Sequence, residues 1–133
     1  LLTYSGSPKS AAAIKRFIQL QLWPDAELRI MTCDRPVNEA ERLLREAARY
    51  CELHQRRVEM HYARGKPEEL IPQHAEEWKA DLVVLGTSTE TLVCDDNWAK
   101  SESTLAGLRV RQAVGTTALH LIKNASRAFF LSN

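Results

Sequence analysis

The segment ADLVVLGTS (residues 80–88) decides the fold of this chain. Residues 82–85 are apolar at every position, without the polar alternation of a strand that has one wet face. A strand of this kind has both faces buried, as in the centre of a parallel sheet that is covered by helices on both sides. Gly86 ends the apolar run. We therefore predict a central strand over residues 82–86.

Outward from this strand, apolar strand-like segments alternate with segments of helical periodicity. Ser7 followed by Pro8 predicts a helix start, because serine caps a helix and proline suits its first position. This helix is expected to run to Trp23-Pro24-Asp25, with Leu22 on its buried face. Further helices are expected from Pro67 to Trp78 and over residues 38–55. The apolar, inward positions of the latter helix are Ala40, Leu43, Leu44, Ala47 and Cys51. The expected strands are residues 1–5, 28–33, 58–62, 82–86 and 128–131.

Five strands separated by helices predict one α/β domain with a parallel sheet and helices on both faces. Periodicity is lost at residues 87–106, which we interpret as an inserted loop, and a helical pattern returns over residues 110–122. In a parallel sheet, a ligand binds at the carboxyl ends of the strands where the strand order reverses. We place the first and fourth strands side by side at that point, so residues 5–8 and the segment from Gly86 would line the site.

The composition limits the classes of partner. The chain has 133 residues, 44% of them hydrophobic, and a formal net charge of +1. This charge gives no reason to expect nucleic acid, and no apolar run approaches the ~20 residues that cross a bilayer. The four histidines lack metal-ligand spacing, so no metal site is predicted.

The cysteines indicate a compartment. Cys33, Cys51 and Cys94 form no CxxC pair, which favours free thiols in the cytoplasm over a disulfide framework.

The chain starts with Leu1 and not with Met. We expect either a domain excised from a longer protein or a chain with further terminal residues.

Four segments together resemble the universal stress protein domain: TYSGSPKSAAAIKRF, ELRIMTCD, ARGKPEELIPQHAEEWKADLVVLGTS and VGTTALHLIKNASRAFFLS. The resemblance covers residues 1–133 apart from the insert at about 87–106. It implies a Rossmann-like sheet of the adenine nucleotide alpha hydrolase type, with strand order 3-2-1-4-5. It also implies a homodimer, and ATP is the possible cofactor because some members bind it.

The ATP-binding members have an Asp after the first strand, a contact residue at the end of the second, and a Gly-x-x-Gly loop with a later Gly-Ser or Gly-Thr. Here Ser5 stands at the Asp position and Thr89 at that of the second glycine, and the closing Gly115-Thr116 lies too far along the chain. The resemblance therefore implies a degenerate ATP site. Its candidate ligand-binding residues are Ser5, Gly6, Ser7, Thr32, Cys33, Gly86, Thr87, Thr89, Gly107, Gly115, Thr116 and Thr117.

Three functions stay open at this point. The first is a stress-response regulatory domain that binds no ATP or binds nucleotide weakly. This domain would act through dimerisation. It can be half of a tandem protein or the soluble domain of a larger protein. The alternative is an ATP-binding universal stress protein. The least favoured is an enzyme, because SGSPKS (residues 5–10) only partly resembles the SGGxDS loop of ATP pyrophosphatases. No catalytic residue is assigned, and weak ATP hydrolysis stays open.

Pairing is expected through the last strand, Ala128, Phe129, Phe130 and Leu131.

Overall fold

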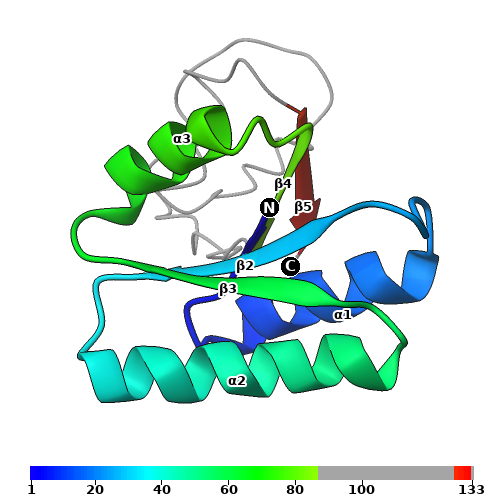
Figure 1. The fold of residues 1–133 in the computed structure, drawn as a ribbon, viewed down its shortest axis with the longest axis horizontal. Helices are drawn as coiled ribbons and strands as arrows, with labels where there is room; N and C mark the ends of the chain where they lie inside the picture. Colours follow the sequence, from blue (N-terminus) through cyan, green and yellow to red (C-terminus); the bar gives the residue numbers. More distant parts are fainter. Residues whose placement is uncertain (87–127, 133) are drawn as a thin grey trace, which may run out of the picture.

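In the computed structural model, which describes residues 1–86 and 128–132, helices flank both faces of one sheet (Figure 1). The elements in chain order are β1 (Leu2–Thr3), α1 (Pro8–Leu20), β2 (Leu28–Cys33), α2 (Val37–Leu53), β3 (Val58–Ala63), α3 (Pro67–Glu77), β4 (Leu82–Gly86) and β5 (Ala128–Ser132). The α/β class predicted from the alternating pattern is confirmed.

The strands form one parallel sheet in the order β3-β2-β1-β4-β5. β1 lies at the centre, because Leu2 pairs with Ile30 of β2 on one side and with Val84 of β4 on the other. The strand order that the resemblance implies is therefore confirmed. The first and fourth strands lie side by side, so their carboxyl ends meet at one edge of the sheet.

Each face of the sheet has its own hydrophobic core. α1 and α2 cover one face, where Ile14, Phe17 and Leu43 pack against Leu2 and Val84. α3 lies on the opposite face, where Ile71 and Ala75 pack against Met31, Val83 and Leu85. Because side chains alternate along a strand, β4 supplies both cores and is apolar throughout.

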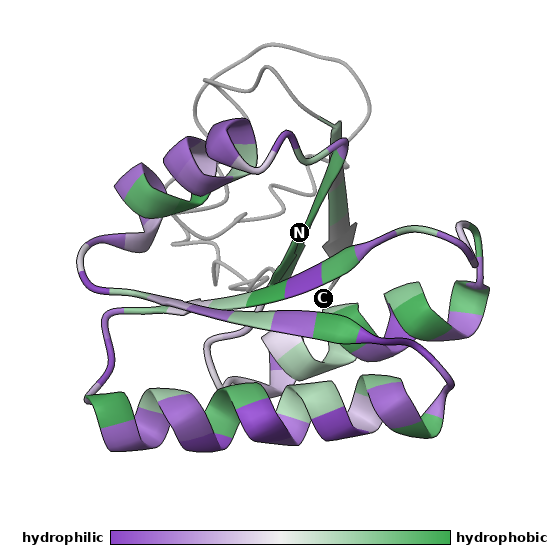
Figure 2. Cartoon of the chain, viewed as in Figure 1, coloured by the Kyte–Doolittle hydropathy of each residue, from purple (hydrophilic) through white to green (hydrophobic). Residues whose placement is uncertain are grey.

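The hydropathy of the helices follows the same division (Figure 2). α2 alternates apolar and polar bands along its length, as a helix does when one face is buried. Its predicted inward positions, Ala40, Leu43, Leu44, Ala47 and Cys51, are all buried. Among the residues that the structure describes, no helix has the length and apolar character needed to span a membrane.

The prediction that the first helix continues to Trp23 is wrong. α1 ends at Leu20, because Gln21 adopts the left-handed conformation with φ of 46° and its N–H turns back to the carbonyl of Ile18. Leu22, which was expected on the buried face, is 54% exposed. The expected insert at 87–106 and the helical pattern at 110–122 lie outside the described residues.

The predicted start of α1 is confirmed. Ser7 is the N-cap, its hydroxyl accepts a hydrogen bond from the N–H of Ser10 at 3.2 Å, and Pro8 occupies the first turn. Proline fits there because the first N–H groups of a helix have no partner within the helix. The cap fixes where the chain turns from β1 into α1.

Replacing Ser7 with alanine should lower the free energy of unfolding by about 1 kcal/mol, because Ser10 N–H loses its acceptor at the helix start. Urea denaturation measures this loss. Lys66→Ala is the matched control: Lys66 is the N-cap of α3 and also precedes a proline, but its side chain makes no cap hydrogen bond. We expect the control to stay within about 0.5 kcal/mol. Equal losses in the two variants would contradict the capping role of Ser7.

Candidate functional site

The turn between β1 and α1 carries a cluster of serine hydroxyls. Ser5 Oγ lies 3.1 Å from Ser7 Oγ and 3.2 Å from Ser10 Oγ, and Ser7 Oγ lies 3.1 Å from Ser10 Oγ. Ser10 Oγ also donates to the carbonyl of Ser7 at 2.9 Å. Gly6 has a φ of 78°, which glycine adopts without strain, and this lets the turn bring the hydroxyls together. The cluster is uncharged, and its hydroxyls are hydrogen bonded to one another.

Gly86 packs directly on the first turn of α1. A Cβ atom at this position would lie 2.5 Å from Ser10 Cα and 2.6 Å from the carbonyl carbon of Lys9, and closer still to the backbone N of Ser10. These obstacles are backbone atoms, which cannot rotate away. The packing of β4 against α1 therefore requires glycine at residue 86.

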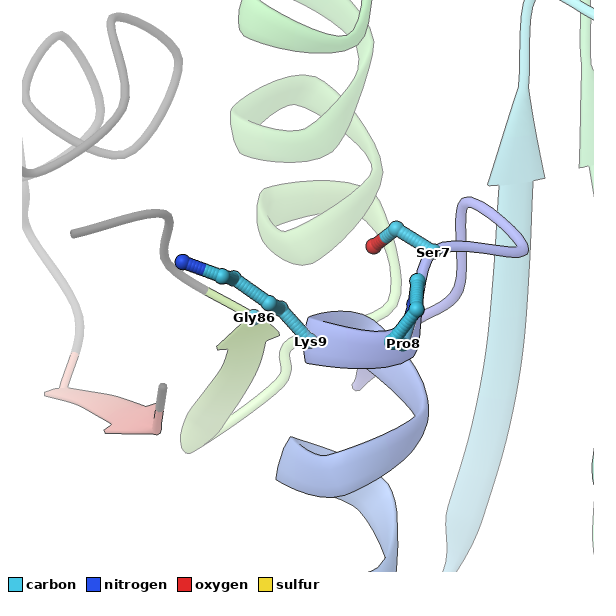
Figure 3. Close-up of a pocket in the computed structure, with 4 residues that line it drawn as sticks. All are labelled: Ser7, Pro8, Lys9 and Gly86. Atoms are coloured by element: carbon cyan, nitrogen blue, oxygen red, sulfur yellow. The ribbon is translucent and has the colours of Figure 1, made fainter. Parts of the chain in front are cut away.

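A pocket of about 410 Å³ opens between these elements, lined by Ser7, Pro8, Lys9 and Gly86. Figure 3 shows the Lys9 side chain extending over Gly86, while the Ser7 hydroxyl points into the space beside it. Among the residues that the structure describes, the lining includes one cation and no carboxylate. This arrangement can accept an anion or hydrogen bond a polar ligand.

Thr32 and Cys33 end β2 without adding a reactive group to the site. Thr32 is 1% exposed, and its Oγ1 has no hydrogen-bond partner among the described residues. It lies on the α1 and α2 face of the sheet, since it alternates with Met31 of the opposite core. Burial, together with the Asp34 carboxylate, raises the pKa of the Cys33 thiol to about 11, so the thiol stays protonated and unreactive near neutral pH.

Arg35 is a site residue that the sequence reasoning missed. Its Nη2 donates to the carbonyl of Ser5 at 3.2 Å, and its own carbonyl accepts a hydrogen bond from Tyr62 Oη at 2.7 Å. The residue thereby connects the ends of β2 and β3 to the β1–α1 turn. Its position directly after the second strand was the available signal, since all carboxyl ends of a parallel sheet share one edge.

The structure brings together four of the predicted site residues, namely Ser5, Gly6, Ser7 and Gly86. Thr32 and Cys33 lie two strands away from Gly86, because β1 separates β2 from β4. No group of histidine, cysteine and carboxylate side chains suited to a metal occurs within residues 1–86 and 128–132. The other predicted site residues lie outside the described residues: Thr87, Thr89, Gly107, Gly115, Thr116 and Thr117.

Comparison with known proteins agrees with this architecture. The model of the universal stress protein family matches residues 34–126. A search of curated proteins found no match.

Solved structures share the fold. A universal stress protein in complex with cAMP is 20% identical, with a TM-score of 0.71 over 99% of this chain and 94% of that one. A universal stress protein from Archaeoglobus fulgidus is 14% identical, with a TM-score of 0.73 over 98% and 95%. Protein Rv1636 from Mycobacterium tuberculosis H37Rv is 28% identical over 68% of this chain and 71% of that one, with a TM-score of 0.58.

Gly86→Ala should lower the free energy of unfolding by about 2 kcal/mol or more, because the added methyl group overlaps the α1 backbone. Urea denaturation measures the loss, and circular dichroism checks that the fold is retained. A loss below about 0.5 kcal/mol, the usual range of a surface substitution, would show that α1 and β4 are not in close contact.

Proposed function

The chain belongs to the universal stress protein family, and from this premise we propose that it is a cytoplasmic stress-response regulatory domain that binds nucleotide weakly or not at all and acts by pairing. The proposal assigns no enzymatic activity. It rests on one observation, the serine-built turn at the carboxyl end of β1. The resemblance implies that ATP-binding members have a carboxylate at this position, and Ser5 offers only a hydroxyl.

The chemistry of that replacement weakens nucleotide binding. A carboxylate accepts charge-assisted hydrogen bonds, which are about twice as strong as those between neutral groups. The Ser5 hydroxyl is neutral and lies within hydrogen-bond distance of Ser7 Oγ and Ser10 Oγ. A ligand would have to replace these interactions, so the net gain from binding there is small.

Gly86 does not by itself argue for a phosphate site. Glycine in a phosphate loop lets backbone N–H groups approach the ligand closely. In this chain the packing of β4 on α1 already requires glycine at residue 86. The residue is therefore explained without a nucleotide.

The alternative is an ATP-binding universal stress protein, and the Lys9 side chain favours it. Lys9 extends over Gly86 at the pocket, where it could meet a phosphate group (Figure 3). A neighbour in fold was solved in complex with cAMP, another adenine nucleotide. These two observations support nucleotide binding as the alternative, so the measurement below is designed to distinguish the two functions.

The proposed pairing uses β5, the edge of the sheet. β5 is hydrogen bonded to β4 on one side, and Ala128 on it is exposed. Phe130 packs edge-on against Phe17 of α1, with ring centroids 6.0 Å apart, which anchors the strand to the core. An anchored strand at the edge of the described sheet can pair with a second copy, or with the other half of a tandem protein.

ATP should bind the purified chain with a dissociation constant weaker than about 1 mM, equivalent to about −4 kcal/mol, by isothermal titration calorimetry. Ser5→Asp restores the carboxylate and should strengthen binding about tenfold or more. Ser5→Asn is the control of similar shape without charge and should give no gain. A micromolar dissociation constant for the unmodified chain would favour the ATP-binding alternative.

Sedimentation velocity should show dimers whose fraction rises with concentration. Ala128→Lys places a charge on the exposed edge strand and should shift the protein to monomer, since charged edge residues oppose strand pairing. Ala128→Ser keeps the edge uncharged and should leave the dimer intact. A monomeric unmodified chain at millimolar concentration would contradict pairing by this domain alone.

A further inference from the structure

A cluster of charged and aromatic side chains lies on the α3 face of the sheet, away from the candidate site at the β1–α1 turn. It consists of Arg29 from β2, Glu59 and His61 from β3, and His74 and Trp78 at the end of α3. Arg29 and Glu59 are direct partners in the register of the two strands, and Arg29 Nε donates to Glu59 Oε2 at 2.9 Å. The Arg29 guanidinium lies over the Trp78 ring, 4.6 Å from its centroid. Arg29 therefore connects the sheet edge to the end of α3.

The contact between Arg29 and His74 defines the protonation of the buried ring. Arg29 Nη1 lies 3.2 Å from His74 Nε2, and His74 is 7% exposed. A guanidinium can only donate hydrogen bonds, so Nε2 must be the acceptor and carry no proton. The docked ring is therefore the neutral tautomer with its proton on Nδ1, the atom that faces the Glu77 carboxylate at 4.0 Å.

His61 places a second titratable ring against the first. The two imidazoles stack with centroids 3.8 Å apart and an interplanar angle of 14°. A proton on His74 would set a second N–H against the guanidinium, and a proton on both rings would put two positive charges in contact. Both changes oppose docking of α3.

The other charged groups that the structure describes around the two rings do not reverse this preference for neutral imidazoles. Glu59 is held by Arg29, and Glu77 is 61% exposed at its side chain, which weakens its attraction for a protonated ring. In the chain as printed, burial lowers the pKa of the Leu1 amino group near His74 to about 6. This group is therefore mostly neutral at pH 7 and gains its positive charge over the same acidic range as the histidines. Among the residues that the structure describes, the Arg29 guanidinium lowers the pKa of both rings by more than the exposed Glu77 carboxylate raises it.

We propose that His61 and His74 form a pH-sensitive latch, in which proton uptake as the pH falls loosens α3 from the β2–β3 edge of the sheet. The α1 and α2 layer on the opposite face does not take part. α3 covers Val83 and Leu85 of β4, so loosening it uncovers the strand that ends at Gly86. The latch makes the fold sensitive to acidification, whether or not a nucleotide binds.

The direction of the effect follows from the histidine equilibria. Burial lowers the pKa of His74 below its ordinary value of 6.5, with His61 and Arg29 adding to the shift. Burial also lowers the pKa of His61, again helped by Arg29. Because an undocked ring binds a proton more readily than a docked one, docking is favoured above about pH 6.5 and weakens as the pH falls below it.

Hydrogen exchange of the unmodified chain tests the proposal at about pH 7.5 and about pH 5.5, with protection factors corrected for intrinsic exchange rates. α3 protection should fall by up to about tenfold for each histidine that gains a proton on opening, while α2 protection stays constant. His61→Phe/His74→Gln keeps a flat ring at residue 61 and an acceptor for Arg29 at residue 74, and neither side chain takes up a proton. Its α3 protection should therefore keep only the pH response of the buried Leu1 amino group. His54→Gln, at the end of α2, is the control and should respond as the unmodified chain does.

A second measurement does not depend on any variant folding. Imidazole ¹⁵N shifts should report the Nδ1–H tautomer for His74 at neutral pH, and both rings should titrate below the ordinary histidine value. A parallel pH response of α2 and α3, a response retained in full in the double variant, or an Nε2–H tautomer at His74 would each overturn the latch.

Discussion

The close contact between Gly86 and the first turn of α1 is the constraint on which the rest of this structure depends. It brings the carboxyl end of β4 to the amino end of α1. The parallel pairing of β1 with both β2 and β4 fixes the order of the three central strands of the sheet. The β1–α1 turn and the end of β4 then meet at one edge, where the pocket forms. The fold thus creates the site before any ligand chemistry is considered.

The site and the fold carry different information about function. The sheet order and the family match agree throughout, yet the residues at the edge differ from those expected of an ATP site. Ser5 supplies a hydroxyl within a neutral cluster, and Lys9 and Arg35 are the cations near it in the part of the chain that the structure describes. Sites of this type change by substitution of a few residues on a constant scaffold, so membership of a family does not define the ligand.

Much of the fold could be predicted from the sequence, because hydrophobic periodicity directly reflects burial. The bounds of β2 and β4 and the buried face of α2 were predicted correctly. The end of α1 was not, because the left-handed conformation of Gln21 leaves no pattern in the sequence, and apolar Leu22 continued the helical spacing by chance. Arg35 and the stacked histidines were missed because their partners lie far away in the chain, and only the strand register brings them together.

The central place of β1 has a consequence for how the chain folds as it is synthesised. Its partner β2 follows closely, but β4 reaches the ribosome exit only after the whole of α2, β3 and α3. Until then one edge of the short first strand has no partner, and the apolar surface meant for β4 faces water. Contacts so distant in sequence slow folding, and an incomplete nascent sheet of this kind is a natural substrate for a chaperone.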